Sequence, residues 1–152
     1  MSDTIRELNI KAIIARLACI TAENGYATDI GTNVVRARKS LDPEELPACA
    51  VFPQPETVEM ISGYTQCIMP VRIEGIVKFG GENPSEAAER VLGDIIACLA
   101  GRGWVRLPDY IDSIAYAGGG TDEYPDEGSV TVGTSALFNV KYMFKIGDPY
   151  SQ

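Results

Sequence analysis

A stretch of alternating residues near the end of the chain constrains the fold more than any other feature. Residues 129–147 read SVTVGTSALFNVKYMFKIG, and one set of alternate positions, from Val130 to Ile146, is mostly β-branched or aromatic. This alternation is typical of a strand with one buried face. At ~3.3 Å per residue the strand would measure roughly 60 Å, whereas a compact chain of this length is only about 40 Å across. We therefore expect the strand to bend, with Gly133 and Ser135 as bend points, or to project from the body.

The segment 4–22 has the apolar spacing of an amphipathic helix. Thr4 and Glu7 have the spacing of a capping box at its start. Asn24 and Gly25 form the kind of dipeptide that ends a helix. The sequence therefore predicts a first helix near the N-terminus.

A second helix is predicted over residues 83–101 by the residues at its two ends. Asn83 is a capping residue, Pro84 occupies the first helical position, and Gly101 stops the helix. The apolar residues within it form a wide stripe that requires a hydrophobic partner. The side chains expected on the solvent side are Glu89, Arg90 and Asp94.

Alternation and turn residues predict further strands at 33–39, 46–52, 66–79 and 112–117. Residues 56–61 form either another strand or the start of the next. Pro47 and Pro53 bracket one of these segments, which favours a short or edge strand. Pro70 and Gly75 within another indicate a bend or bulge. Strands in blocks flanked by helices predict an α+β fold with a single sheet that is either antiparallel or mixed. Both helices should pack on one face, and a long β-hairpin should project.

The whole chain, residues 1–152, is expected to form one domain with a real hydrophobic core. Its hydrophobic content of 45% is that of a globular protein. The glycine-rich, acidic segment 117–129 is expected to be a flexible loop, and residues 148–152 a short C-terminal tail. No apolar run is long enough to span a membrane, and the N-terminal segment lacks the features of a signal peptide.

Charge and composition exclude several classes of function. The net charge of −8 argues against specific nucleic-acid binding, which needs clustered basic residues. The chain has no histidine, so it lacks the commonest general base and zinc ligand. The carboxylate pair Asp109 and Asp112 has nothing to place it in a pocket. We therefore expect no catalytic residues, no cofactor and no metal, and predict that the protein is not an enzyme.

The four cysteines, Cys19, Cys49, Cys67 and Cys98, are widely spaced and lie among apolar residues. No two of them have the spacing of a metal-binding or redox pair. This pattern favours buried, reduced thiols in a reducing compartment over a zinc site or disulfides.

Two clusters of opposite charge are the remaining candidates for function. The acidic residues after Gly118–Gly120 lead to a strand, which disfavours a phosphate loop, and their spacing lacks the order of a helical calcium loop. They indicate either a solvated loop or contact with a basic partner. The basic cluster has the same two alternatives, a solvated strand face or a surface for another subunit. The residues proposed for a subunit interface are Arg36, Arg38, Lys39, Asp122, Glu123, Asp126 and Glu127.

The order of segments resembles a known family over residues 4–147. A helix of ~18 residues leads to the strand Leu46-Pro47-Ala48-Cys49-Ala50-Val51, and a long strand then ends in a glycine-rich turn. The helix NPSEAAERVL and a final, very long strand follow. In the order of its segments, its size and its general residue pattern, the chain is similar to the small tail terminator and tail completion proteins (minor tail protein U-like) of long-tailed bacteriophages. The likeness includes no signature motif.

The resemblance implies an α+β protomer that assembles as a ring, most often a hexamer. Such a ring caps the phage tail tube and presents the surface that joins the head. The implied partners are other copies of the chain, the tail tube protein and a head–tail connector protein. The implied location is the bacterial host cytoplasm during assembly and then the virion tail. The alternatives are a head-closure or tail-tube subunit and, from another class, a small-molecule enzyme or binding domain with a pocket between sheet and helices.

Overall fold

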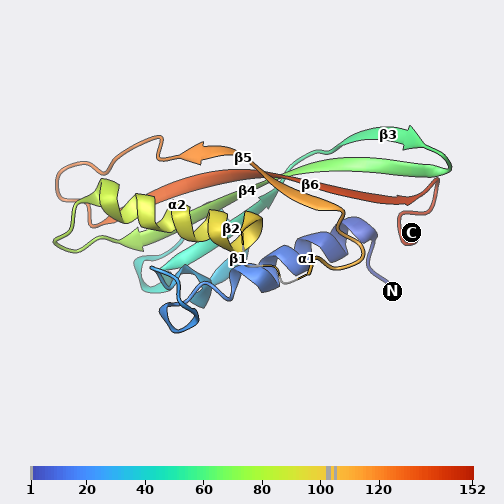
Figure 1. The fold of residues 1–152 in the computed structure, drawn as a ribbon. Helices are drawn as coiled ribbons and strands as arrows, with labels where there is room; N and C mark the ends of the chain where they lie inside the picture. Colours follow the sequence, from blue (N-terminus) through green and yellow to red (C-terminus); the bar gives the residue numbers. More distant parts are fainter. Residues whose placement is uncertain (1, 102–103, 105) are drawn as a thin grey trace.

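The computed structural model describes residues 2–101, 104 and 106–152. Its two helices are α1 (Ile5–Leu17) and α2 (Pro84–Ala100). Its strands are β1 (Val34–Arg36), β2 (Ala48–Pro53), β3 (Thr57–Ile61), β4 (Tyr64–Lys78), β5 (Ser113–Gly120) and β6 (Thr131–Lys145). Short 3₁₀ turns are η1 (Ala22–Asn24), η2 (Ile30–Thr32) and η3 (Pro43–Glu45). The order of helices and strands agrees with the predicted α+β class (Figure 1).

The described strands form one six-stranded sheet in the order β1-β2-β4-β6-β5. β3 pairs with the first residues of β4, beyond the end of β2 and on the same side of β4. β1 and β2 are parallel, and the other pairs are antiparallel. The sheet is therefore mixed, which is the second of the two alternatives that the sequence left open, and not wholly antiparallel. The cause is the segment 37–47, which is long enough to carry the chain back before β2 begins.

β2 is short, as predicted, but it does not lie at an edge. It runs between β1 and β4, and its residues Ala48–Phe52 are all buried. Pro47 and Pro53 are tolerated because one precedes the strand and the other is its last residue. The prolines therefore limit the length of this strand rather than its depth in the sheet.

β4 and β6 are joined by an uninterrupted ladder of 15 residues on each strand. The bulge expected at Pro70 and Gly75 is absent from this ladder. The Pro70 carbonyl accepts a hydrogen bond from the Gln54 amide, in the gap between β2 and β3. The nitrogen of Pro70 lies on the same side of the strand, so its lack of an N–H breaks no bond to β2 or β3. Gly75 has another role, because a Cβ there would lie 2.3 Å from Cγ1 of Val91 on α2. The glycine therefore allows close packing of helix on sheet.

Both helices pack on the same face of the sheet. β4 and β6 direct alternate side chains into one core, among them Val71, Phe138, Val140 and Tyr142. That core also holds the buried residues of α1 and α2, including Ile13 and Ile95. The predicted faces of both long strands and the placing of both helices are confirmed.

α1 is shorter than the predicted helix of residues 4–22. Thr4 caps it by accepting a hydrogen bond from the Glu7 amide. The helix ends at Leu17, because the following turn must pass Gly31, whose missing Cβ would lie 2.5 Å from the Leu17 carbonyl oxygen. Gly25, expected to end the helix, ends the 3₁₀ turn η1 instead.

Asp94 on α2 is buried, and its predicted solvent exposure is wrong. Its carboxylate accepts hydrogen bonds from the Ala27 amide at 3.0 Å, the Thr28 amide at 2.7 Å and the Thr28 hydroxyl at 2.6 Å. The loop before η2 covers this turn of the helix, which the pattern of α2 alone does not reveal. Asp94 therefore fixes that loop to the helix.

β5 extends to Gly120, four residues into the segment 117–129 that was predicted to be a loop. The glycines pair with β6, and a Cβ at Gly119 would lie 2.3 Å from the Ser135 carbonyl oxygen. Glycine is therefore needed here because the backbones of β5 and β6 approach closely, and not because the chain turns. The flexibility of the remaining loop stays a prediction.

The two longest strands give the molecule its length. Fifteen residues correspond to ~50 Å of strand, and β4 and β6 run nearly from one end of the molecule to the other (Figure 1). β3 and the adjoining ends of β4 and β6 form the right-hand end of the view, and the loop before β6 lies at the left. The projecting β-hairpin stays a prediction, because β4 is joined to β6 along its whole length.

Candidate assembly surfaces

The basic segment lies at the β1 edge of the sheet, and its two arginines are paired within the chain. Arg36 donates two hydrogen bonds to Glu7 on α1, at 2.5 and 2.8 Å. Arg38 donates two to Glu45 in η3, both at 2.8 Å. The Arg38 guanidinium lowers the pKa of Glu45 to about 2, aided by the Asp42 amide. These pairs neutralise much of the segment, and exposed Lys39 is in no ion pair within the described chain.

The acidic residues Asp122, Glu123, Asp126 and Glu127 lie in the loop between β5 and β6, and all four are exposed. Among the described residues, no ion pair engages any of them. We call Asp122–Glu127 the acidic loop. Its Tyr124 lies near the start of α2, where the Tyr124 hydroxyl is 3.4 Å from the hydroxyl of Ser85. The loop is therefore a strongly negative surface that no described residue compensates with an ion pair.

The structure does not bring the two charged clusters together. The basic segment lies at the β1 edge, whereas the acidic loop follows β5 at the opposite edge. Within one chain, four intervening strand spacings of ~4.8 Å separate the two edges. A contact between the clusters therefore requires a second copy.

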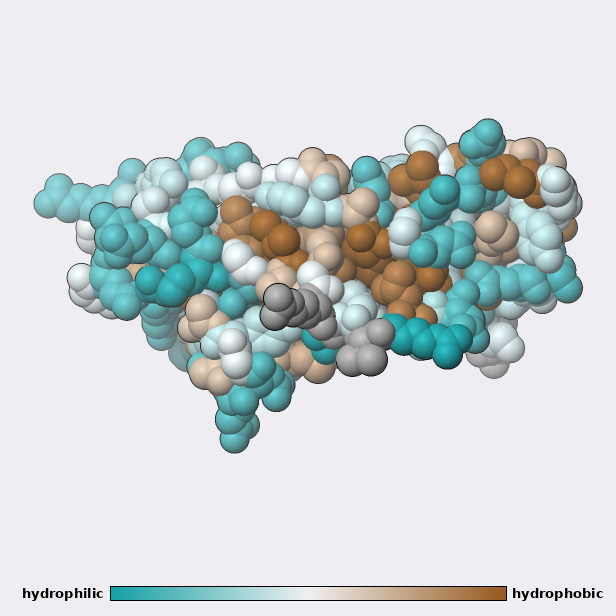
Figure 2. Space-filling view, in the orientation of Figure 1, coloured by the Kyte–Doolittle hydropathy of each residue, from teal (hydrophilic) through white to brown (hydrophobic). Residues whose placement is uncertain are grey.

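An apolar surface that the sequence pattern does not reveal lies at the end of the molecule opposite the acidic loop. Six large hydrophobic side chains are exposed there, between 38% and 66% of their area. They are Val58, Met60, Ile61, Ile68, Ile146 and Tyr150. We call this set the apolar end, and hydrophobic residues are visible at the surface there (Figure 2). The signal was present in the alternation of TVEMI, but the pattern of one strand does not show which face lacks a cover.

The apolar end is firmly attached to the body. β3 and β4 are joined by the two-residue turn Ser62-Gly63, and both turn residues have positive φ, as tight hairpins require. The segment before β3 is tied to α1, because Arg6 donates hydrogen bonds to Glu56 at 2.6 Å and to the Gln54 carbonyl at 2.8 Å. A rigid surface of this kind loses little conformational entropy on binding a partner.

Tyr142 on β6 also binds Glu56, donating a hydrogen bond to its carboxylate from the core. Burial, together with this bond to a carboxylate, raises the pKa of the Tyr142 hydroxyl far above its usual range. The phenol therefore stays neutral and remains a donor throughout the physiological pH range. Arg6, Glu56 and Tyr142 form a structural connection between α1, the segment leading to β3, and β6.

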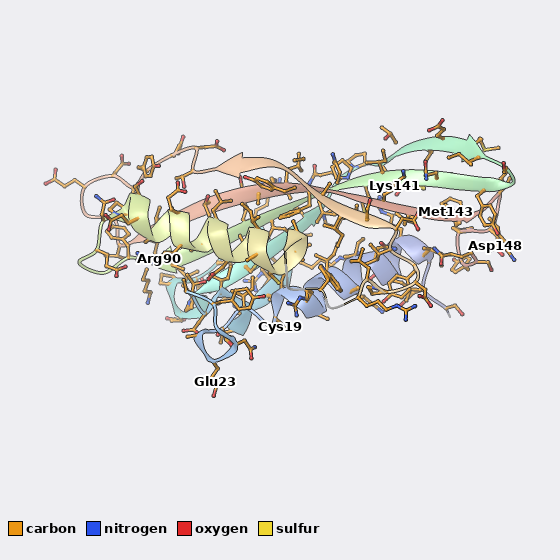
Figure 3. The ribbon with its side chains drawn as sticks, viewed as in Figure 1. Cys19, Glu23, Arg90, Lys141, Met143 and Asp148 are labelled. Carbon is orange, nitrogen blue, oxygen red and sulfur yellow. The ribbon has the colours of Figure 1, made fainter. Side chains whose placement is uncertain are left out.

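The two ends of the molecule thus differ in chemistry. Figure 3 shows Asp148 at the end formed by the tips of β4 and β6, with Lys141 and Met143 along β6, and Arg90 toward the other end. The charged residues near the apolar end are of both signs, whereas the acidic loop carries four carboxylates and no basic residue. The molecule therefore has one apolar end with charges of both signs and, toward the other end, the four carboxylates of the acidic loop.

Neither of two open hollows on the described surface gathers a recognisable set of catalytic groups. One, of about 290 Å³, is lined in part by Lys78, Glu82 and Arg90 near the start of α2. Arg90 is paired there with Glu82. The other, of about 390 Å³, lies on the open face of the sheet beside Asp122 and Glu123. Among the described residues there is no cluster of three side chains that suit a metal ion.

Asp109 and Asp112 do not form a catalytic pair. Asp109 is exposed and lies 3.3 Å from Arg106, in a loop before β5. Asp112 is exposed as well, and its amide donates to the Lys141 carbonyl. No helix in the described part of the chain is long and apolar enough to cross a membrane.

The cysteines are placed as the sequence predicted for three of the four. Cys49, Cys67 and Cys98 are buried, whereas Cys19 near the end of α1 is partly exposed (Figure 3). Burial raises the pKa of Cys67 and of Cys98 to about 11. At pH 8 these two thiols are therefore protonated and weakly nucleophilic.

We predict that all four cysteines are reduced and hold no metal, and that only Cys19 reacts quickly in the folded protein. Thiol titration at pH 8 should count one rapid thiol before denaturation and four after it, without added reductant. Metal analysis of the same sample should find no stoichiometric zinc. Fewer than four thiols in the denatured protein, or three rapid thiols in the folded one, would contradict this prediction.

No protein-family model matches this chain, and no curated protein matches it. Among solved structures, one similar chain comes from the structure described as "Virion of native gene transfer agent (GTA) particle". The two chains are 15% identical, the match covers 92% of each, and the TM-score is 0.49.

Proposed function

We propose that this chain is a structural subunit of a phage tail. In this proposal six copies of the chain assemble as a closed ring. In this proposal the ring caps the tail tube and presents the surface that the head joins, as in tail terminator and tail completion proteins. Its partners are then the tube protein and a head–tail connector protein. The protein acts in the bacterial host cytoplasm during assembly and afterwards within the virion tail.

The observation that carries the proposal is the distribution of unlike surfaces over the molecule. The basic segment and the acidic loop lie at opposite edges of the sheet, and the apolar end lies far from the acidic loop. A ring of identical head-to-tail contacts uses two different surfaces of each copy, one for each neighbour. Two different ends then serve two different partners, one on each side of the ring.

The order of elements supports the same proposal. The resemblance to tail terminators rests on a helix, short strands, a long strand, a second helix and a final long strand, and the observed elements follow that order. The described side chains present surfaces rather than a constellation of catalytic groups. We therefore propose that these surfaces serve assembly and that the protein is not an enzyme.

Neutralising the acidic loop tests whether it meets a neighbour in the ring. Asp122→Asn, Glu123→Gln, Asp126→Asn and Glu127→Gln are introduced together, since none of these exposed carboxylates is in an ion pair with another described residue. Exposed pairs contribute ~0–1 kcal/mol each, so we expect assembly to weaken roughly tenfold, or about 1.4 kcal/mol, at low salt. Light scattering over a concentration series measures the change.

The control for this experiment neutralises exposed carboxylates elsewhere, at Glu44 and Glu89, and should leave assembly unchanged. The effect of the loop variant should also fade at high salt. Stronger assembly of the loop variant would show that the loop repels its neighbours, and would contradict its place at an interface. A protein that stays monomeric and does not bind tail tubes would contradict the proposed function itself.

The basic segment calls for a milder change than reversal of all three charges. Arg36 and Arg38 are held by Glu7 and Glu45, so glutamate in their place would face a carboxylate within the same chain. If that variant failed to assemble, the result would not distinguish a folding defect from a defect at the subunit interface. Lys39→Glu alone avoids the difficulty.

A further inference from the structure

We propose that β3 of one copy pairs with β5 of the next, so that one antiparallel sheet continues from subunit to subunit. This inference rests on the proposed ring and names the strands that would join its members. β3 and β5 lie on opposite sides of the β4–β6 pair, and each has one edge without a partner in the described chain. A head-to-tail contact joins two such different edges.

The chemistry of the two edges favours pairing. β5, SIAYAGGG, has no charged residue, and β3, TVEMI, has only Glu59. Soluble proteins usually protect free edges with charges, proline or bulges. β5 has a bulge between Tyr116 and Gly118, which leaves Ser113–Tyr116 regular and close in length to β3. The β1 edge, by contrast, is three residues long and leads into the basic segment.

Strand direction agrees with this pairing. β3 is antiparallel to β4, β4 to β6, and β6 to β5. β3 therefore runs with β6, and β5 runs the opposite way. When copies follow one another in the same orientation, β5 of one copy meets β3 of the next as an antiparallel neighbour. The alternation of the sheet is thus preserved across the boundary, and antiparallel pairs are the more stable kind.

Apolar side chains on the two edges also lie on the same side of the sheet. Val58 lies opposite Cys67 in the sheet, and Cys67 points into the core that the helices cover. Tyr116 lies opposite Phe138 and contacts its ring, with 5.6 Å between the ring centroids, on that same face. In a continuous sheet, exposed Val58 and Met60 of one copy fall on the same face as exposed Tyr116 of its neighbour. Pairing the edges would therefore remove apolar area from water on both copies.

The offset between the two edges suits a closed assembly. Glu59 is level with Met143 of β6, whereas Ala115 is level with Asn139, four residues away along the strand. Four residues correspond to ~13 Å, and the four strands β3-β4-β6-β5 to a width of ~19 Å. An edge pairing with this stagger tilts the strands by roughly 35°, which is within the range of closed barrels.

A second copy suits these edges better than a strongly charged partner. The chain has a net charge of −8, so copies repel one another except where carboxylates are sparse. β5 itself has no carboxylate and β3 has only Glu59, whereas the acidic loop and the start of α2 each hold several. A basic partner would be drawn to the acidic surfaces rather than to these edges.

Cysteine cross-linking tests the pairing directly. Glu59→Cys and Ala115→Cys are combined in a Cys19→Ser background, and the assembled protein is treated with a short bismaleimide. Both positions are exposed and fall on the open face of the sheet. Within one copy they are three strand spacings apart, ~14 Å, with the stagger in addition, so a short reagent joins only different copies. We expect a ladder of covalent multimers that ends at the ring number.

The two single variants serve as controls, and each should remain monomeric on a denaturing gel. Light scattering of every sample, recorded before the reagent is added, shows whether an oligomer is present. An oligomer whose double variant gives no ladder would overturn the β3–β5 pairing and leave the ring intact. Dimers of the single variant Glu59→Cys would show a symmetric contact and overturn the pairing as well. A sample that is monomeric throughout and does not bind tail tubes would overturn both the pairing and the ring.

Discussion

Val140→Asp should abolish soluble expression of the protein. Val140 is fully buried on β6, paired with Met69 of β4 on one side and with Ile114 of β5 on the other. The described residues of the core cluster around Val140 include no basic side chain that could pair with a carboxylate there. Burying an unpaired charge costs several kcal/mol or more. That cost is comparable with the whole stability of a domain, ~5–15 kcal/mol. Soluble yield after expression is the measurement.

Two control variants separate burial from charge in this experiment. Asn139→Asp places the same carboxylate one residue earlier, on the opposite face, where the side chain is half-buried and open to water. It should express normally. Val140→Thr keeps the shape but buries a hydroxyl, and should fold with a loss of about 1–3 kcal/mol. A soluble Val140→Asp protein with the unfolding temperature of the parent would contradict the assigned face of β6.

Asp94→Ala should lower the free energy of unfolding by about 2–4 kcal/mol, because hydrogen bonds to a charged group contribute ~1.5–3 kcal/mol each and do not add fully. The change leaves two amides and one hydroxyl of residues 27–28 without their acceptor. For a chain of this size the unfolding temperature should fall by roughly 5–15 °C. Thermal and denaturant unfolding both measure the effect.

The matched control for Asp94 is Glu89→Ala, a truncated carboxylate at an exposed position of the same helix. It should change stability by less than ~0.5 kcal/mol. Asp94→Asn retains one acceptor oxygen and should fall between the two. A loss below ~1 kcal/mol for Asp94→Ala would mean that water replaces the carboxylate, and that the loop of residues 27–28 is not fixed by it.

The local signals in the sequence were sufficient for most elements. α2 was predicted correctly from its cap and its apolar stripe, because Asn83 and Pro84 act through the nearest turn of backbone. The alternation of β4 and β6 identified their buried faces, since a strand packed on one side shows that side in every second residue. In a long strand with regular alternation, the sequence alone is therefore enough to identify the buried face.

The misses share a physical cause, which is contact between segments far apart in the chain. The burial of Asp94 depends on the loop at residue 28, and the end of α1 depends on Gly31. The direction of β1 depends on the path of residues 37–47, which no local pattern encodes. The apolar end was missed because apolar residues on a strand indicate burial in general, and only the fold shows that no helix covers these.

The charged candidates were located correctly as clusters, but their partners were not predicted. Arg36 and Arg38 find carboxylates 29 and 7 residues away, so much of the basic segment is neutral in the folded chain. The acidic loop has no such compensation among the described residues. Of the seven residues proposed for a subunit interface, the four acidic ones and Lys39 are therefore the better candidates.

Assembly into a closed ring is the central claim, and electron microscopy of the negatively stained, purified protein tests it most directly. The images are recorded at a concentration where light scattering shows association, and again after mixing with tail tubes. We predict rings with a central opening and one fixed rotational symmetry, free in solution or seated on the ends of tubes. Monomers or compact dimers in both samples, with bare tube ends, would contradict the claim.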